Sequence, residues 1–261
     1  MLKKRLIGVV TVKNEWAVQS FGYSKYLPLG KTKCLVENLD RWGADEILVQ
    51  VIDRSIKNFG PDFSLLEQLG KIGLETPLIY AGGIKSVTDG LKAIQLGADR
   101  IVIDSLIHLD LSIIRELSEK LGAQALIASL PLSWQTNNLM WLDYKKNILK
   151  PLPEKVLELI SLGFVSEVLI TDYCHEGLPG NFEQKLIQEF PLKKIPIIAF
   201  GGINTCEQMR ELLYFDNIAA IAVGNFLSYK EHAIQKYKMA LNGLPLRHPI
   251  YESIYSHLTN V

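Results

Sequence analysis

Eight short apolar runs rich in Val and Ile recur at even spacing along the 261 residues, and they limit the possible folds more than any other feature. These runs are nearly continuous rather than alternating apolar with polar residues, which is typical of parallel strands covered on both faces. We expect strands at residues 6–12, 46–52, 77–80, 100–103, 125–130, 167–171, 195–200 and 218–223.

Amphipathic stretches of helical period separate these runs, at residues 87–96, 111–121, 153–162, 206–213 and 230–241. Several helices are followed by a glycine, a small residue and an acid, as in Gly43-Ala44-Asp45-Glu46 and Gly97-Ala98-Asp99-Arg100, and Gly163 similarly precedes Glu167. A glycine at that place supplies the left-handed cap that ends a helix. The alternation predicts an α/β fold, with the irregular segment 131–153 as a small excursion after the fifth strand.

The chain also resembles itself at half its length. Residues 79–86 (IYAGGIKS) are echoed by residues 198–205 (IAFGGINT), 119 positions later, and residues 46–49 are echoed by 167–170 at a shift of 121. Two segments that return nearly the same shift indicate a duplicated half-barrel. We therefore expect a single (β/α)8 TIM barrel over residues 1–241, rather than an open doubly wound sheet.

The remainder, residues 242–261, is expected to be a C-terminal tail that packs on the barrel or extends from it. Its Tyr251, Ile254 and Tyr255 could form a short docking helix.

Composition excludes several classes of protein. The 28 basic residues balance 28 acidic residues, which leaves no electrostatic footprint for nucleic acid or an anionic membrane. No run approaches the roughly 18 apolar residues of a membrane span, and residues 1–12 fit a first strand better than a signal peptide. We expect a cytoplasmic protein.

The cysteines indicate neither a disulfide framework nor a metal site. Cys34, Cys174 and Cys206 show neither C-x-x-C nor ligand spacing, so no disulfide framework, metal or cofactor is expected.

Glycine pairs stand where the third and seventh strands end, at the face where barrels of this type carry their sites. Glycines let the backbone approach an oxygen-rich group, and helix N-termini favour anions. The alternative is that they only permit tight turns. The internal echo favours two phosphate sites on opposite sides of one mouth and a ligand with a phosphate at each end. These sites comprise Gly82, Gly83, Asp104 and Ser105 in one half and Gly201, Gly202, Gly224 and Asn225 in the other.

Several segments together, in order and spacing, make the chain similar to the HisF family, the cyclase subunit of imidazole glycerol phosphate synthase. They are MLKKRLI at 1–7, GADE at 43–46, AGGI at 81–84 with GADR at 97–100, IT at 170–171 with EG at 176–177, and IAFGG at 198–202. The resemblance runs from residue 1 to about residue 238. It implies a barrel that binds a bis-phosphorylated ribonucleotide and receives ammonia from a HisH-like glutaminase on its other face. It assigns phosphate binding to Gly83, Asp104, Ser105, Gly177, Gly202 and Gly224.

The family's catalytic positions differ in this chain. The resemblance places a general acid/base Asp at the end of the first strand and another at the end of the fifth, but here those positions are Thr11 and Pro131. Neither side chain can hold and release a proton near neutral pH. Glu176 and Asp53 remain as candidate catalytic carboxylates, and Asp172 also ends a strand.

A cysteine and a histidine stand side by side after the sixth strand. Cys174 next to His175 suggests a nucleophile with its base, although the sequence identifies no group that would orient either side chain. A structural role is the favoured interpretation.

Four charged residues begin strands of the expected barrel: Arg5, Glu46, Arg100 and Glu167. If they point inward they form a neutral ring, which is tolerable when buried only because the charges pair. An ordinary ion-pair plug is the alternative. The resemblance implies an ammonia gate beneath the glutaminase, and it matches Asp99 to a position that docks that partner.

The retained gate and the missing acids favour one function over two others. The favoured hypothesis is a subunit that resembles the HisF-like proteins of surface-polysaccharide clusters. It would pass ammonia from a glutaminase to a separate amidotransferase that acts on a nucleotide-linked or N-acetyl sugar. The first alternative is a histidine-pathway cyclase whose acid/base groups have moved to Glu176 and Asp53. The second is a non-catalytic scaffold for the glutaminase. Whether the chain is itself an enzyme stays open.

Overall fold

A closed ring of eight parallel strands forms the centre of the molecule in the computed structural model, which describes residues 3–180 and 182–247. Around the ring the order is β10, β11, β12, β1, β4, β5, β6 and β7, and pairing of β7 with β10 closes it. All eight expected strands and the TIM-barrel architecture are confirmed. The strands are β1 (Arg5–Lys13), β4 (Glu46–Val51), β5 (Leu78–Ala81), β6 (Arg100–Ile103), β7 (Leu126–Gln135), β10 (Glu167–Asp172), β11 (Ile197–Phe200) and β12 (Ile218–Val223).

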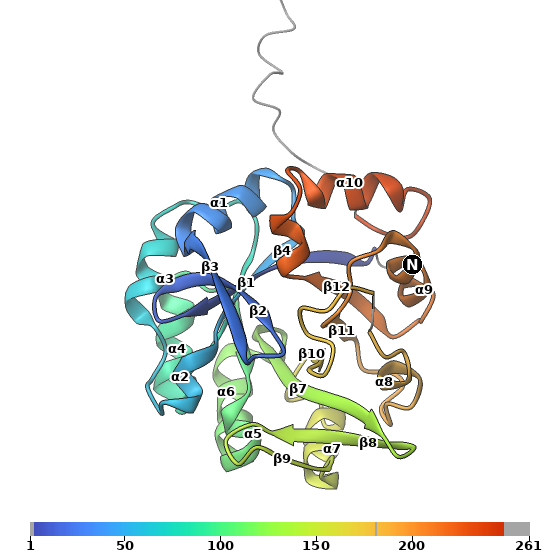
Figure 1. Cartoon of the computed structure of the whole chain (residues 1–261). Coiled ribbons are helices and arrows are strands. Elements are labelled where there is room, and N and C mark those ends of the chain that lie inside the picture. Colours follow the sequence, from blue (N-terminus) through green and yellow to red (C-terminus); the bar gives the residue numbers. More distant parts are fainter. Residues whose placement is uncertain (1–2, 181, 248–261) are drawn as a thin grey trace, which may run out of the picture.

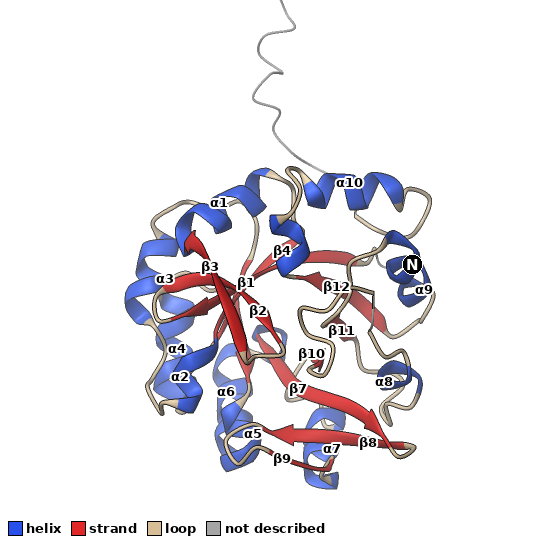
Figure 2. Ribbon diagram, viewed as in Figure 1, coloured by secondary structure: helices blue, strands red, loops and turns tan. Residues whose placement is uncertain are grey.

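Helices surround the strands on the outside, as Figure 1 and Figure 2 show. Ser86 and Thr205, which occupy matching positions in the two halves, each cap a helix by accepting from the N–H three residues later. The half-length echo therefore extends to capping. The helices are α1 (Thr32–Arg41), α2 (Ile52–Ile56), α3 (Phe63–Gly70), α4 (Val87–Gln95), α5 (Ser105–Leu109), α6 (Leu111–Leu121), α7 (Glu154–Ser161), α8 (Lys185–Gln188), α9 (Cys206–Leu213) and α10 (Ala233–Ala240), with short turns η1 (Ala123–Ala125) and η2 (Asn225–Ser228).

Alternate residues of each strand supply two separate apolar cores. Outward side chains such as Ile47 and Val49 pack beneath the helices. Inward side chains fill the barrel lumen, and they are Ile7, Val9, Leu48, Ile79, Ala81, Val102, Ile127, Leu169, Ile198, Phe200, Ala220 and Ala222. The middle of the lumen is therefore apolar and closely packed, with charged or polar groups only towards its two ends.

The turns of glycine, small residue and acid join the helices to the strands as expected. Gly43 and Gly97 adopt φ of 75° and 112°. The acid that follows then extends the strand ladder through its side chain. Asp45 donates its N–H to the Leu6 carbonyl, and its carboxylate accepts from the Leu6 N–H at 2.7 Å. Asp99 makes the same pair of contacts with Leu78.

Two antiparallel extensions leave the barrel at its mouth, which is the end where the parallel strands terminate. The segment 131–153 contains β8 (Asn138–Asp143) and β9 (Ile148–Pro151), which continue from β7. The sequence did not predict the other extension, the hairpin of β2 (Trp16–Phe21) and β3 (Lys25–Lys31). The turn between β1 and β2 has positive φ at Asn14 and Glu15 without a glycine, whereas the turn of the hairpin itself has positive φ at Gly22 and Tyr23, so only one of the two turns carries the glycine that usually marks a hairpin.

The β2–β3 hairpin is fixed against the loops that follow β10 and β12. Glu176 is buried and accepts hydrogen bonds from the Ser20 hydroxyl at 3.0 Å and the Tyr23 N–H at 3.2 Å. The Asn225 amide bonds both main-chain groups of Ser20. A side chain at Gly177 would come within 2.2 Å of the Ser20 carbonyl oxygen, so only glycine permits this approach.

The chain returns to the opposite pole after α10. Residues 245–247 run beside the start of β1, where Lys4 donates its N–H to Pro245 and accepts from the Arg247 N–H. The tail residues Tyr251, Ile254 and Tyr255 lie outside the described residues. Within the described part of the chain, no helix combines the length and apolar character needed to cross a membrane.

Replacing Lys238 by Met should lower the free energy of unfolding by about 3–5 kcal/mol, because one partner of a buried ion pair is removed. The Lys238 ammonium donates to Asp45 at 2.7 Å and to the Gly43 carbonyl at 2.8 Å, and its side chain is 1% exposed. Urea unfolding followed by circular dichroism measures the change. Lys236→Met, an exposed position on the same helix, is the matched control. A loss below about 1 kcal/mol for Lys238→Met would contradict the assignment.

Replacing Glu176 by Gln should loosen the β2–β3 hairpin while leaving the barrel folded. The change removes the charge from two charge-assisted hydrogen bonds, worth about 1.5 kcal/mol or more in total, which corresponds to about tenfold faster local opening. Hydrogen exchange of residues 16–31 measures this directly. Exchange in the barrel strands should stay unchanged, and Glu189→Gln on the exposed surface should affect neither region.

Candidate functional site

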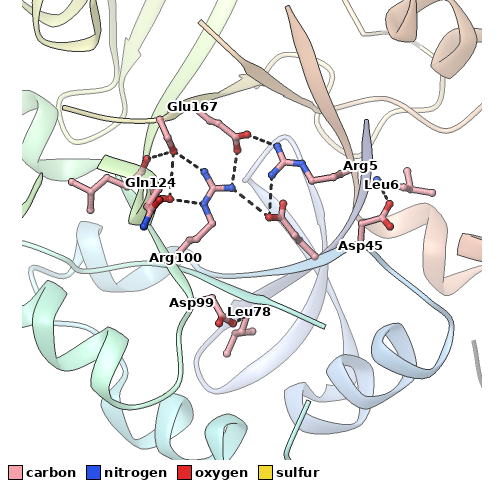
Figure 3. Close-up of polar contacts among 11 residues, drawn as sticks. Arg5, Leu6, Asp45, Leu78, Asp99, Arg100, Gln124 and Glu167 are labelled. Carbon is pink, nitrogen blue, oxygen red and sulfur yellow. Dashed lines mark hydrogen bonds and ion pairs between the residues drawn. The ribbon is translucent and has the colours of Figure 1, made fainter. Parts of the chain in front are cut away.

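Four charges close a ring across the lumen at the pole where the strands begin (Figure 3). Arg5 bonds Glu46 at 3.0 Å and Glu167 at 2.5 Å. Arg100 approaches the same two carboxylates at 3.4 Å and 2.7 Å. The structure thus brings together the four residues expected at this pole, with charges of alternating sign.

The ring is shielded from solvent, since the four side chains are only 8% to 13% exposed. Burial raises the pKa of Glu46 above its usual value, although Arg5 and Arg100 both act to lower it. The Oε2 atom of Glu46 is buried without a hydrogen-bond partner among the described residues. Arg100 is further fixed by bonds to the Gln124 carbonyl and the Ser166 hydroxyl. The Oε2 atom of Glu46 is thus the ring's acceptor without a donor among the described residues.

Asp99 lies immediately beside this ring, one residue before Arg100. Its backbone and its carboxylate bond Leu78, yet the residue as a whole is exposed. The position is compatible with the expected role in docking a partner, which stays a prediction.

At the opposite pole, the glycine turns of the second half surround a small pocket. Gly201 and Gly202 adopt φ of 107° and 75°. A side chain at Gly201 would lie 2.5 Å from the Asp172 carbonyl oxygen, so the turn requires glycine. The pocket is lined by Thr11, Glu176, Gly177, Phe200, Gly201, Gly202, Ile203, Ala222, Gly224, Asn225 and Phe226. Gly177, Gly201, Gly202, Gly224 and Asn225 are thus brought together as expected.

In the matching turns of the first half, several polar groups form hydrogen bonds within the protein. Gly83 donates its N–H to the Ser55 hydroxyl at 3.2 Å, and the Ser105 hydroxyl donates to the Ile84 carbonyl at 3.2 Å. The Asp104 carboxylate accepts from the Tyr144 hydroxyl at 2.7 Å. Burial raises the pKa of Asp104 to about 6, opposed by Tyr144, Lys145 and Ser55. Gly82, Gly83, Asp104 and Ser105 are close to one another, and the Gly83 N–H, the Asp104 carboxylate and the Ser105 hydroxyl are each bonded within the protein.

Neither of the family's two catalytic positions offers a carboxylate. Thr11 is buried near the end of β1, and its hydroxyl accepts from the Gln50 amide at 2.7 Å. Pro131 lies within β7, opposite Thr171 of β10. The mouth therefore lacks an acid/base pair at these two strand ends.

The two substitute carboxylates are engaged elsewhere. Glu176 holds the hairpin, as described above, and burial raises its pKa. Asp53 lies on α2, where it pairs with Lys57 at 2.9 Å and accepts from the Asn14 N–H. The structure does not bring these two carboxylates into contact with each other.

One arrangement was not identified from the sequence. His175 bonds the carboxylate of Asp172 through Nδ1 at 2.7 Å, and that carboxylate also accepts from the Glu183 N–H. His175 therefore does have an orienting partner. The spacing of three residues between Asp172 and His175 could have suggested this contact. An acid at the end of a strand does not by itself show where its side chain points, however. Cys174 is exposed, and partial burial of its thiol raises its pKa, which does not favour a reactive thiolate.

Two tyrosines from the extensions cover the mouth. Tyr23 comes from the hairpin tip, and burial followed by the charge of Glu176 raises its pKa well above its usual value. Tyr144 comes from the turn between β8 and β9 and covers Asp104. Searching residues 3–180 and 182–247 finds no group of three or more side chains suited to hold a metal ion.

The comparisons with known proteins agree with this geometry. A family model described as "Histidine biosynthesis protein" matches residues 34–233. The chain is 30% identical over 251 residues to a Campylobacter jejuni protein provisionally named imidazole glycerol phosphate synthase subunit hisF2, covering 95% of this chain and 99% of the relative. A Vibrio vulnificus protein with the same provisional name is 28% identical, covering 89% and 86%.

A relative with the established subunit name is similar at nearly the same level. Imidazole glycerol phosphate synthase subunit HisF of Buchnera aphidicola is 27% identical over 259 residues, covering 95% of this chain and 99% of the relative. The family model spans well over half of the chain, and the match to the Campylobacter protein spans nearly all of it. This chain therefore belongs to the histidine biosynthesis protein family, as a member of its HisF branch.

Proposed function

We propose that this barrel accepts ammonia from a HisH-like glutaminase and passes it to amidation of a surface-polysaccharide sugar, with a separate sugar amidotransferase as a further partner. One observation carries the proposal. The ion ring that the family resemblance associates with ammonia entry is intact, whereas Thr11 and Pro131 replace both carboxylates of the cyclase reaction at the other end of the same lumen.

The ring has the properties of an entrance for a small neutral molecule. Its four charges balance, so the ring does not attract or repel by net charge. The unpartnered Oε2 atom of Glu46 offers an acceptor for an N–H group. Above the ring, the inward side chains from Ile7 to Ala222 are apolar. Neutral ammonia loses far less solvation in such surroundings than ammonium does, so the lumen favours the form that acts as a nucleophile.

The mouth supports delivery of ammonia to chemistry other than the cyclase reaction. General acid/base catalysis needs a group that exchanges protons near the operating pH. Thr11 and Pro131 supply none, and Glu176 and Asp53 are engaged with the hairpin and with Lys57. These contacts argue against a cyclase that has moved its acid/base pair to these two residues.

A phosphorylated small molecule is proposed as the ligand of the mouth. The glycine turns at Gly177, Gly202 and Gly224 leave a pocket where main-chain groups are accessible to an anion. Retention of such a pocket favours a barrel with its own ligand over a scaffold that only stabilises the glutaminase. The proposed location is the cytoplasm, which suits the free cysteines Cys34, Cys174 and Cys206.

Mixing the purified chain with its cognate glutaminase tests the proposal. We expect association, activation of glutamine hydrolysis, and no imidazole glycerol phosphate from the bis-phosphorylated ribonucleotide. Arg5→Ala should lower the activation at least tenfold because it breaks the ring, and Glu46→Ala should act similarly. Arg115→Ala, at an exposed position on α6, is the control.

Each contrary result has a distinct meaning. Robust formation of imidazole glycerol phosphate would support the cyclase alternative instead. Activation that survives both ring substitutions would support the scaffold. Failure of the two proteins to associate would contradict all three functions.

A further inference from the structure

The two halves of the mouth carry opposite chemistry at equivalent places. Gly82-Gly83 corresponds to Gly201-Gly202, and the residues that end the neighbouring strands correspond as Asp104 to Gly224 and Ser105 to Asn225. Gly224 has no side chain, and a Cβ built there would meet nothing closer than 3.5 Å. Asp104 places a carboxylate at the equivalent point. The pseudo-two-fold of the fold is therefore broken at the residue that ends these two corresponding strands.

Two donors of the first-half turn are used within the protein, although the N–H groups of Ile84 and Leu106, which correspond to Ile203 and Phe226, have no acceptor among residues 3–180 and 182–247. The Gly83 N–H bonds the Ser55 hydroxyl, and the Ser105 hydroxyl bonds the Ile84 carbonyl. Tyr144 donates to Asp104, and Ser55 is close enough to contribute to the stabilisation of the same carboxylate. The anion of this turn is thus the Asp104 side chain itself.

The second-half turn has no carboxylate at the position of Asp104, because Gly224 stands there, and three of its N–H groups are available. Among residues 3–180 and 182–247, no acceptor bonds the N–H groups of Gly202, Ile203 or Phe226. The three residues line one pocket together with Glu176, Gly177 and Gly224. The Glu176 carboxylate is engaged on the hairpin side, where it accepts from Ser20 and Tyr23.

We propose that the mouth binds a ligand with a single phosphate, held at the second-half turn, whose other end presents a hydroxyl or amino group to Asp104. A sugar monophosphate or an amino-sugar phosphate has this chemistry. The inference rests on the phosphate site of the proposed function and narrows its substrate class. A second phosphate on the ligand meets a carboxylate where a donor is needed, and like charges in a partly desolvated site repel strongly.

Tyr144 is a positioning residue in this arrangement. It reaches Asp104 from the turn between β8 and β9, so the extension fixes the direction of the carboxylate. A hydroxyl or amino group on the ligand donates to a carboxylate without displacing it. The far end of the mouth therefore selects hydrogen-bond donors and rejects anions.

Isothermal titration calorimetry of the full chain alone at pH 8 tests the inference, with fructose 6-phosphate and fructose 1,6-bisphosphate as probes. For the natural chain we expect the bisphosphate to bind no more tightly than the monophosphate. Asp104→Asn should tighten bisphosphate binding at least tenfold and change monophosphate binding less than threefold. Gly224→Asp, the mirror change in the second half, should weaken both probes at least tenfold. Asp104 adopts a similar backbone at the equivalent place, with φ −125° and ψ −77° against −107° and −105° at Gly224, and circular dichroism checks that the variant is folded.

The pH dependence gives an independent readout. Since the pKa of Asp104 is raised to about 6, lowering the pH from 8 to 5 neutralises it and should improve bisphosphate binding relative to monophosphate binding. The same change of pH should alter that ratio less in Asp104→Asn, whose ratio supplies the baseline for titration of the phosphates themselves. Tyr144→Phe should weaken the discrimination while retaining monophosphate binding.

The outcomes separate this inference from the proposed function. Tenfold tighter binding of the bisphosphate by the natural chain, or no gain in Asp104→Asn, would overturn the inference while leaving a phosphate site in place. Binding of neither probe by any variant would overturn the inference and the phosphate site together. Ammonia transfer is measured separately in the glutaminase complex, so its failure leaves the monophosphate preference intact.

Discussion

Pairing of opposite charges at the pole where the strands begin is the interaction on which the proposed ammonia entrance depends. Arg5 and Arg100 each contact both Glu46 and Glu167, so four strands are tied across the lumen by groups that would be costly to bury singly. The closed network lets polar groups stand at the end of an apolar lumen. A barrel with an unpaired charge there would be destabilised.

The mouth of the barrel differs from this pole, because its polar and charged side chains hold the two antiparallel extensions in place. Glu176 and Asn225 hold the β2–β3 hairpin, and Asp104 is covered by Tyr144 from the β8–β9 extension. Both extensions continue barrel strands, so the tyrosines at their turns are carried to the mouth by the sheet itself. The proposed ligand site is consequently shaped as much by these insertions as by the eight strands.

Much of the scaffold could be predicted from the sequence, since burial on both faces gives a parallel strand a continuous apolar pattern. The ring could also be predicted, because four strand starts carry balanced charges. The β2–β3 hairpin was not predicted, because the turn that leads into it at Asn14 and Glu15 lacks a glycine and Gly22 in its own turn does not by itself indicate strand pairing. The pairing of Asp172 with His175 and of Asp104 with Tyr144 depends on side-chain direction and on contacts between distant segments, about which spacing alone says little.

The residues just before the ring have a consequence for its geometry. Asp45, Asp99 and Ser166 each donate a backbone N–H to the preceding barrel strand, at Leu6, Leu78 and Leu126 respectively. Each is followed at once by a ring residue, Glu46, Arg100 or Glu167. These bonds fix how far alternate strands slide along their neighbours, and so set three of the four charges at a common height. The common height of these three charges is therefore a product of strand stagger, and a one-residue slip at any of these junctions would turn a charge from the axis towards the helices.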